Sequence, residues 1–470
     1  MARRFTPKKI KLLPKRSWIE DFLYLTIFNY LKFNHDHFYY NKIHLLNKEN
    51  IPPVGTPLII AANHQNAIND PLAIEFAFPD RVVTIFTRAD AFKKNLIGKF
   101  LRTLYLLPAY RMRTDGEDTL KYNYAMFEEA GGRLLGGNAV AIFPEATNQD
   151  KHWLGDFSLA YLCMAFETAK DSDFETDIHV LPIAIHYADY FKMQEDMMIT
   201  CGTPISLKPY YELYKSKPRT AQREVNREVR RQIDAMMLNI TDLDNYEAID
   251  YIRNTYGVPF AERNQLNPSD LPQKLKADQM LVEILNNLKD NDKETAEQIF
   301  ADALLLKKEV NQNNFSESLI FYKGSNFMIF MMCISFILLF PIFVIGLIPN
   351  AIVYYSVEPI VNKFKNIGGK LSLLASGVRF VMMSLYAMPL FYAITVALEC
   401  IFLSWIVGVV HLVLMPFLGI FAVHYVKGFK SLNRILKFKW VKQTNYSKVQ
   451  KIINIRDRLF KNLDKIAWKQ

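Results

Sequence analysis

Two long uncharged stretches in the C-terminal third constrain this chain more than any other feature. Residues 326–355 are thirty consecutive residues without a charged side chain, and residues 380–426 are forty-seven residues in which Glu399 carries the only formal charge. A helix needs about 20 apolar residues to cross a bilayer, so the second stretch is long enough for two crossings. The sequence therefore predicts an integral membrane protein, although its mean hydropathy of +0.00 resembles that of a soluble chain.

Charges beside these stretches predict their arrangement. The loop between them carries four Lys or Arg residues and one Glu, and the tail after residue 426 is strongly basic. Short basic loops favour the cytoplasmic side of a membrane. We therefore expect two helical hairpins with both chain ends cytoplasmic. The stretch 326–355, broken by Pro341 and Pro349, would lie shallow or re-entrant, and 380–426 would span with a turn near Ser404. Three plain spans remain the alternative if the charge bias is ignored.

The net charge of +10 is unevenly distributed. Residues 1–17 hold seven bases and no acid, and residues 427–470 hold thirteen bases and two acids, so the two ends together carry +18. This leaves −8 for residues 18–426. Basic ends are typical of nucleic-acid binding, but the adjoining apolar stretches favour anionic lipid headgroups. We expect a phospholipid membrane as partner and no nucleic acid.

The N-terminal apolar run FLYLTIFNYL (22–31) is too short to span a membrane. It predicts an interfacial helix with Arg16 and Lys32 at the headgroups, or a helix packed on a soluble domain. No h-region or cleavage site follows the basic N-terminus, so we expect no signal peptide. The four cysteines lie far apart without a CxxC pair, which favours buried, reduced thiols.

Residues 50–206 alternate short β-rich runs with helical stretches. This alternation predicts an α/β domain with a largely parallel or mixed sheet flanked by helices. The expected strands are 57–63, 81–87, 139–144, 178–187 and 197–205, and the expected helices lie near 70–78, 91–105, 117–131 and 157–170. Surface helices rich in paired charges are expected at 218–239 and 272–310, with a proline-containing linker at 257–272.

The segment NHQNAIND (63–70) is the first candidate for chemistry. It ends a hydrophobic strand and precedes a helix, so His64 lies in a strand-to-helix turn. Each residue alone has an ordinary structural explanation, because Asp70 before Pro71 is typical of a helix N-cap and His64 of a polar turn. Together they indicate more, because a carboxylate can orient an imidazole that takes a proton from a substrate hydroxyl.

Two further segments end apolar runs. Arg111 and Arg113 follow the first, and guanidinium groups bind phosphate bidentately, although a solvated basic loop has the same composition. Glu145 in FPEAT (143–147) follows the second, at a strand end where open α/β sheets bind ligands. A carboxylate there would hydrogen-bond substrate hydroxyls or brace an arginine. No second histidine stands at metal-ligand spacing, so we expect no metal site.

The order of four blocks, NHQNAIND, LPAYR, FPEAT and VLPIAI (180–185), resembles that of the glycerolipid (PlsC-type) acyltransferase family, which comprises glycerol-3-phosphate and lysophosphatidate acyltransferases. The resemblance covers roughly residues 40–215. Five residues separate His64 from Asp70 where the family usually has four, which resembles a subgroup of glycerol-3-phosphate acyltransferases with C-terminal membrane segments. Ala146 stands where the family has glycine.

The resemblance implies that a fatty acyl group passes from a thioester to a hydroxyl of glycerol 3-phosphate or lysophosphatidate in phospholipid biosynthesis. The donor would be acyl-CoA or acyl carrier protein, and no cofactor is implied. His64 and Asp70 would be catalytic. The side chains that would bind the acceptor are Arg111 and Arg113 for its phosphate, and Glu145 and Thr147 for its hydroxyls.

Five regions are expected on this basis, with the catalytic domain and both termini cytoplasmic. They are a basic N-terminus with an interfacial helix (1–39), the catalytic domain (40–215), a helical surface region (216–320), a membrane region of two hydrophobic hairpins (321–426) and a basic tail (427–470).

Other functions fit the sequence less well. A transporter would place ionisable residues within its spans, and only Glu399, His411 and His424 qualify. An inactive lipid-binding scaffold would have a damaged first block, whereas His64 and Asp70 are both present. Acylation of another lipid hydroxyl, such as that of an amino-acid lipid, by the same pair remains open.

Overall fold

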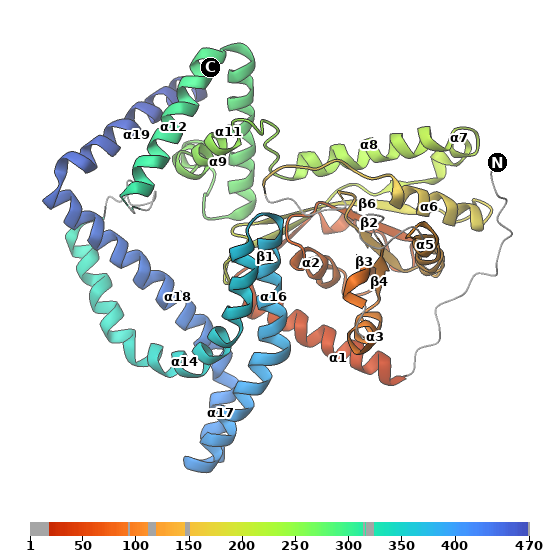
Figure 1. The fold of residues 1–470 in the computed structure, drawn as a ribbon, viewed down its shortest axis with the longest axis horizontal. Coiled ribbons are helices and arrows are strands. Elements are labelled where there is room, and N and C mark those ends of the chain that lie inside the picture. Colours follow the sequence, from red (N-terminus) through yellow and green to blue (C-terminus); the bar gives the residue numbers. More distant parts are fainter. Residues whose placement is uncertain are drawn as a thin grey trace. The chain divides into compact units, whose positions relative to one another are not determined.

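The computed structural model describes residues 18–92, 95–110, 119–145, 151–313, 315 and 324–468 (Figure 1). Contacts between residues group the chain into two compact units. The first consists of Met1–Met237 with Val361–Phe380, and the second of Leu238–Ile360 with Val381–Gln470. The border expected at residue 216 therefore falls inside the first unit.

A mixed sheet forms the centre of the first unit, as the sequence predicts. In the described residues, eight strands pair in the order β1-β7-β6-β2-β5-β3-β4, with β8 beside β6. All neighbours from β6 to β4 are parallel, whereas β7 and β8 run antiparallel to β6. The strands are β1 (Ile43–Leu46), β2 (Leu58–Ala62), β3 (Val83–Arg88), β4 (Leu106–Ala109), β5 (Ala139–Ile142), β6 (His179–Tyr187), β7 (Met197–Cys201) and β8 (Ile205–Ser206).

Helices follow the strands at the places that the alternating pattern predicts. Every residue of β2 is buried. Parallel strands are usually covered on both faces, so their sequences are continuous apolar runs, as that of β2 is. Helix positions differ from the expected ranges by only a few residues at each end. They are α2 (Asn69–Ala77), α3 (Asn95–Thr103), α5 (Thr119–Leu135), α6 (Ala160–Asp171) and α8 (Pro218–Met236). Helix α7 (Tyr211–Ser216) was not expected.

Helix α8 is less of a surface helix than its charges suggest. Val225, Val229 and Ile233 follow one another at intervals of four residues, and all three are fully buried in the core of the first unit. Residues at this spacing share one face of a helix, so the charged residues occupy the opposite face. The helix therefore belongs to the α/β unit rather than to the separate helical region expected from residue 216.

Helix α1 (Trp18–Asn34) forms where the sequence predicts a short apolar helix. Tyr24, Phe28 and Leu31 are buried in the first unit. The opposite side of the helix leaves Trp18 78% exposed and Phe22 62% exposed, which is unusual for such large apolar side chains. The helix is thus both packed on the domain and apolar on its open face.

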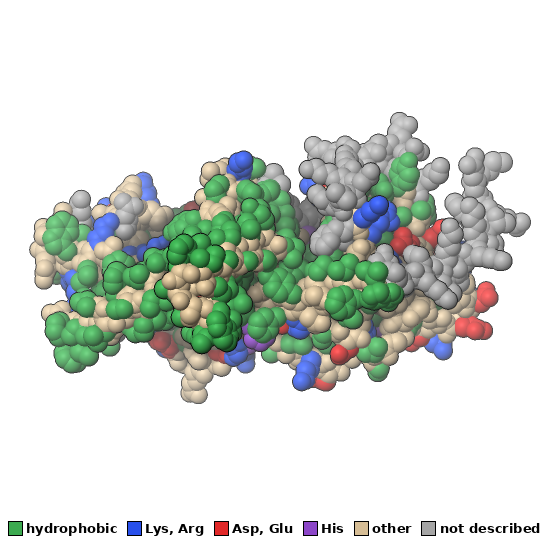
Figure 2. Space-filling view, turned by 90° about the horizontal axis from the view of Figure 1, so that it is seen from below, with side chains coloured by type: hydrophobic (Ala, Val, Ile, Leu, Met, Phe, Trp, Pro, Cys, Tyr) green, Lys and Arg blue, Asp and Glu red, His purple; other side chains and the backbone are tan. Residues whose placement is uncertain are grey.

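Three helices in the described residues are long and apolar enough to cross a membrane: Asn326–Ile367, Leu374–Phe402 and Trp405–Thr444. The second and third turn at Leu403 and Ser404, close to the predicted turn, and Ser404 caps the third helix by accepting from Val407 N–H. These helices are α14 (Asn326–Ile367), α16 to α17 (Leu374–Met382, Met388–Phe402) and α18 (Trp405–Thr444). Figure 2 shows many hydrophobic side chains, coloured green, exposed on one face of the molecule.

The hairpin predicted within 326–355 is wrong. Helix α14 continues through Pro341 and Pro349 for 42 residues without a turn. A proline removes one helical hydrogen bond, but ending the helix in an apolar environment would leave many backbone groups unpaired, so membrane helices tolerate proline. The three-span alternative matches the helices that the structure contains.

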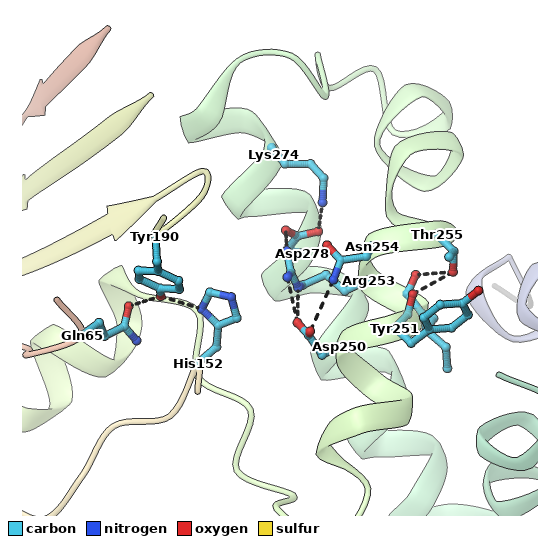
Figure 3. Close-up of polar contacts among 11 residues, drawn as sticks. Gln65, His152, Tyr190, Asp250, Tyr251, Arg253, Asn254, Thr255, Lys274 and Asp278 are labelled. Atoms are coloured by element: carbon cyan, nitrogen blue, oxygen red, sulfur yellow. Dashed lines mark hydrogen bonds and ion pairs between the residues drawn. The ribbon is translucent and has the colours of Figure 1, made fainter. Parts of the chain in front are cut away.

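A helical bundle completes the second unit. Its helices are α9 (Tyr246–Thr255), α10 (Gly257–Arg263), α11 (Leu271–Asn291), α12 (Lys293–Gln312) and α19 (Tyr446–Ala467). The linker predicted at 257–272 is wrong in its first half, because α10 fills it and buries Phe260 and Ala261. Figure 3 shows the ion-pair network of Arg253, Asp250 and Lys274 around the buried Asp278 within this bundle.

The basic C-terminal region is structured rather than a free tail. Helix α18 continues to Thr444, and α19 packs against α12. Two bases of α19 pair with acids of α12: Lys451 Nζ lies 2.6 Å from Glu309 Oε1, and Arg458 Nε lies 2.9 Å from Asp302 Oδ2. Part of the positive charge expected to face lipid is therefore already paired within the bundle.

The cysteines are free thiols in the structure, as the sequence predicts, but their burial was predicted incorrectly. Cys201 is buried, whereas Cys163 and Cys400 are exposed. Helix periodicity explains the difference, since both exposed residues lie on the outer faces of helices α6 and α17.

Candidate active site

The parallel strands bring three sequence blocks to one edge of the sheet. Strands β2, β5 and β6 are neighbours and run in the same direction, so their carboxyl ends lie at the same edge. His64 follows β2, Glu145 follows β5, and Tyr187 ends β6. The topology therefore assembles residues that are far apart in the sequence.

Asn63 fixes the chain just before His64. Its side-chain Oδ1 accepts from the backbone N–H of Ile185 at 2.7 Å, and its Nδ2 donates to the carbonyl of the same residue at 3.0 Å. The side chain is fully buried, and it continues the pairing of β2 with β6 where the backbone of β2 turns away. This pairing determines where the turn that carries His64 begins.

His64 and Asp70 are paired as the sequence predicts. Nδ1 of His64 lies 2.9 Å from Oδ2 of Asp70, whose side chain is fully buried. The imidazole stacks on Phe143, with ring centroids 4.2 Å apart and planes 22° apart. The His64 side chain is 15% exposed, and its Nε2 makes no hydrogen bond within the described part of the chain. One ring nitrogen is thus held while the other is open to a substrate.

Asp70 accepts three further hydrogen bonds, which decide the tautomer of His64. Oδ2 accepts from the backbone N–H groups of Gln65 at 2.8 Å and Asn66 at 2.7 Å, and Oδ1 accepts from the hydroxyl of Tyr187 at 2.6 Å. A carboxylate surrounded by donors acts as an acceptor toward the imidazole too, so Nδ1 carries the proton. Nε2 then has a free lone pair and can act as a base.

Tyr187 stays protonated in this site. Burial raises the pKa of its phenol well above the ordinary value, and the neighbouring Asp70 carboxylate raises the pKa further. The hydroxyl therefore donates to Asp70 throughout the physiological range. Asp70 is not the N-cap that its position before Pro71 suggested, because α2 begins at Asn69 and the carboxylate binds backbone groups that precede the helix.

Glu145 binds the backbone of its own domain. Oε1 accepts from the backbone N–H of His64 at 2.8 Å, and Oε2 accepts from the backbone N–H of Gly155 at 2.7 Å. The side chain is only 6% exposed. The carboxylate therefore connects the His64 turn to the segment that follows the third block.

A second hydrogen-bonded group supports the same turn (Figure 3). The hydroxyl of Tyr190 donates to Oε1 of Gln65 at 2.5 Å and lies 3.2 Å from Nδ1 of His152. Gln65 directly follows His64 and is 2% exposed. The end of β6 and the segment that follows it therefore both hold the turn, through Tyr187 at Asp70 and through Tyr190 at Gln65.

Arg111, Arg113 and Thr147, expected to bind the acceptor, lie outside the described residues. Arg111 and Arg113 follow β4, which is parallel to β3 and ends at the same edge as the strands that carry His64 and Glu145. Among the described residues, no three His, Cys, Asp or Glu side chains lie close enough to share a metal ion.

The sequence did not indicate the residues that hold the His64–Asp70 pair. Tyr187, Tyr190 and Asn63 are at or beyond the ends of predicted strands, which is the one signal that could have indicated them. Their partners are more than 115 residues away in the sequence, so no local pattern reveals which turn they contact.

Three comparisons show what this chain is similar to. Residues 42–186 match the protein family Acyltransferase. An uncharacterized acyltransferase of Schizosaccharomyces pombe is 26% identical over 162 residues, and the match covers 33% of this chain and 23% of the relative's length. The crystal structure of the 1-acyl-sn-glycerophosphate acyltransferase PlsC from Thermotoga maritima has a TM-score of 0.31 and 18% identity, covering 46% of this chain and 83% of that one. Residues 42–186, which contain His64, Asp70 and Glu145, are thus similar to the Acyltransferase family.

Proposed function

We propose that the chain is a membrane-bound O-acyltransferase of phospholipid biosynthesis. It transfers a fatty acyl group from an acyl thioester to a hydroxyl of glycerol 3-phosphate or lysophosphatidate. The observation that carries the proposal is the His64–Asp70 pair, with Nδ1 bound at 2.9 Å and Nε2 open. This geometry is that of a general base, which suits attack by a hydroxyl that the substrate supplies.

In the proposed reaction, Nε2 of His64 removes the proton of the acceptor hydroxyl while its oxygen attacks the thioester carbonyl. The carbon–sulfur bond then breaks, and the leaving thiolate takes the proton from the imidazolium. Asp70 stabilises the imidazolium in between, because its carboxylate is fully buried beside Nδ1. General base catalysis of this kind contributes about 10²–10⁴-fold to a rate.

The acceptor phosphate is proposed to bind Arg111 and Arg113, with Thr147 near the glycerol hydroxyls. The order of the blocks supports this assignment. Glu145 already uses both carboxylate oxygens on backbone N–H groups, so its proposed part is to fix His64 rather than to bind the hydroxyls. No group beyond the two substrates is needed for the bonds that form and break.

A membrane setting suits a substrate and a product that are lipids. Three helices are long and apolar enough to span, and α1 adds an open apolar face on the domain that carries His64. We propose that these surfaces contact the phospholipid bilayer, and that the basic ends lie at its anionic cytoplasmic surface together with the active site. Each Lys or Arg near such a surface contributes about 1 kcal/mol.

The test is an acyl-transfer assay on membranes that contain the full chain. Labelled acyl-CoA and acyl carrier protein thioesters are offered in turn with glycerol 3-phosphate and with lysophosphatidate, and membranes with the His64→Ala variant provide the background. Transfer to either acceptor above that background supports the proposal. Transfer to neither, from an intact protein at wild-type level, overturns it and favours another lipid hydroxyl, such as that of an amino-acid lipid.

A further inference from the structure

A segment outside the family-matched region packs directly on the catalytic turn. Residues 361–380 connect the first and second apolar helices in the sequence, yet they group with the first compact unit. They include the end of α14, α15 (Gly369–Ser372) and most of α16. Their contacts are with residues 68–69, with the Tyr39–Tyr40 segment and with the loop after β6.

Gly377 allows the closest of these contacts. A β-carbon at this position would lie 2.3 Å from Cβ of Ile68 and 3.1 Å from Oδ1 of Asn69. Real β-carbons do not approach that closely, so any side chain would push α16 away from the turn or displace Ile68. Ile68 lies two residues before Asp70, inside the turn that joins it to His64.

Ser376 ties the same turn to the N-terminal segment. Its Oγ accepts from Nδ2 of Asn69 at 3.0 Å and lies 2.8 Å from the hydroxyl of Tyr39. Nδ2 of Asn69 also donates to the hydroxyl of Tyr40 at 2.9 Å. Asn69 and Ser376 are both at least 98% buried, so these hydrogen bonds are shielded from competing water.

Arg379 contacts the loop after β6. Its guanidinium donates from Nη1 to the backbone carbonyl of Phe191 at 2.7 Å, and the residue is 2% exposed. Phe191 follows Tyr190, whose hydroxyl binds Gln65. Arg379 therefore fixes the loop that in turn fixes the residue next to His64.

We infer that Ser376, Gly377 and Arg379 are positioning residues for the His64–Asp70 pair. The segment 361–380, which connects two apolar helices in the sequence, therefore belongs to the active site. The effect that we expect on kcat rests on the proposed function, whereas the positioning of the turn does not. The orientation of His64 and Asp70 would then depend on the segment 361–380, which an apolar helix precedes and another follows in the sequence.

The test uses the full chain in detergent or vesicles with four substitutions: Gly377→Val, Ser376→Ala, Arg379→Met and Arg379→Lys. We expect Gly377→Val and Arg379→Met to lower kcat about 10- to 100-fold, because misplacement of a base by about 1 Å has effects of this size. KM for the acceptor should change little. Arg379→Lys, which retains a donor, should recover part of the loss, and Ser376→Ala, the mildest change, should lower kcat least.

Two measurements report on the turn without any acyl transfer. Hydrogen exchange of peptides that cover residues 63–70 should accelerate in the variants, because the N–H groups of Gln65 and Asn66 lose their fixed partner on Asp70. The rate of modification of His64 by diethyl pyrocarbonate, read by mass spectrometry, should rise for the same reason. The matched controls are Ser372→Ala, at a half-buried position whose hydroxyl binds only Gly369 in the contacts described, and Lys363→Met, at an exposed position; both lie in the same segment and should change neither rate.

The outcomes separate this inference from the proposed function. Folded variants with wild-type exchange, wild-type His64 modification and wild-type kcat overturn the inference while leaving the function intact. A wild-type protein that transfers acyl groups to neither acceptor overturns the function, and the exchange and modification rates then still decide whether this segment positions the turn. If Gly377→Val does not fold, the variants Ser376→Ala, Arg379→Met and Arg379→Lys decide whether this segment positions the turn.

Discussion

The carboxylate of Glu145 binds the backbone N–H of His64 across 81 residues of sequence, with 2.8 Å between Oε1 and the nitrogen. The other oxygen binds the N–H of Gly155 at 2.7 Å. Backbone donors hold a carboxylate more rigidly than a mobile side chain would, and charge-assisted hydrogen bonds of this kind are strong. The third sequence block thus supports the first block, and loss of this support should affect His64 before it affects the substrate.

Glu145→Gln should lower kcat more than it raises KM for the acceptor. The amide retains one acceptor oxygen but turns an N–H₂ group toward one of the two backbone N–H donors, which leaves a buried donor unpaired at a cost of about 1–3 kcal/mol. Steady-state kinetics with varied acceptor measures the two parameters. A large rise in KM with kcat unchanged would instead indicate that Glu145 binds the acceptor hydroxyls directly.

His64→Ala should reduce acyl transfer by about 10²–10⁴-fold, which is the usual contribution of a general base. The fold should persist, since only the ring with its bond to Asp70 and its contact with Phe143 is lost. His37→Ala is the control, because His37 is exposed in the same unit and binds only its own helix. Near-normal transfer in the His64→Ala variant would exclude the mechanism.

Asp70→Asn tests the assigned tautomer. The amide N–H₂ group would face donors on at least one side, so His64 would be driven to carry its proton on Nε2, where it can no longer accept one. We expect a fall in kcat of about 10³–10⁴-fold, the size seen when a buried carboxylate beside a catalytic histidine is replaced by its amide. Tyr187→Phe removes one of the four hydrogen bonds to Asp70 and should cost far less. Equal losses in the two variants would contradict this account.

The sequence was sufficient to predict the sheet and the contact between His64 and Asp70, because both depend on local patterns. Buried parallel strands are nearly uniform apolar runs, so β2, β5 and β6 are visible without any knowledge of their partners. His64 and Asp70 are six residues apart, and a single turn brings such neighbours together. Strands β1 and β4 were not predicted, and they differ from β5, which has the same length, in being less completely buried.

Contacts between distant segments could not be predicted in this way. Tyr187 is 117 residues from Asp70, and Ser376 is 307 residues from Asn69, so no periodicity relates the partners. The hairpin predicted within 326–355 failed because proline was taken as the end of a helix. In an apolar surrounding the cost of unpaired backbone groups outweighs one lost hydrogen bond, and α14 continues.

Asn350 joins the three apolar helices of the second unit, and its loss should destabilise them. Nδ2 donates to the carbonyls of Gly346 at 2.9 Å and Met415 at 3.0 Å, and Oδ1 accepts from the hydroxyl of Tyr392 at 2.6 Å. Hydrogen bonds between membrane helices contribute about 0.6–1.7 kcal/mol each, so Asn350→Leu should lower the free energy of unfolding by about 1–4 kcal/mol.

The measurement for Asn350 is thermal unfolding in a mild detergent. Tyr392→Phe, which removes one of these hydrogen bonds, should have a smaller effect than Asn350→Leu. Ser335→Ala removes a bond that stays within α14 and should leave the midpoint almost unchanged. A midpoint for Asn350→Leu equal to that of the wild type would show that packing alone holds these helices together.

Glu75 should make the stability of the protein fall as the pH rises. Burial raises the pKa of its carboxyl from 4.5 to about 8, against a smaller opposing effect of the hydrogen bond with Tyr24. The folded protein therefore holds this proton more tightly than the unfolded chain does. The contribution of Glu75 to the free energy of unfolding is fully present below about pH 4.5 and is lost progressively as the pH rises to about 8.

Glu75→Gln removes this dependence, because glutamine resembles the protonated acid and cannot ionise. The variant should match the wild type at about pH 4.5, and above about pH 8 it should be more stable by up to roughly 4 kcal/mol. Thermal unfolding at the two pH values measures the difference, with the exposed Glu128→Gln as the control that should follow the wild type. An equal difference in stability between Glu75→Gln and the wild type at both pH values would contradict this prediction, because it would mean that folding leaves the pKa of the carboxyl unchanged.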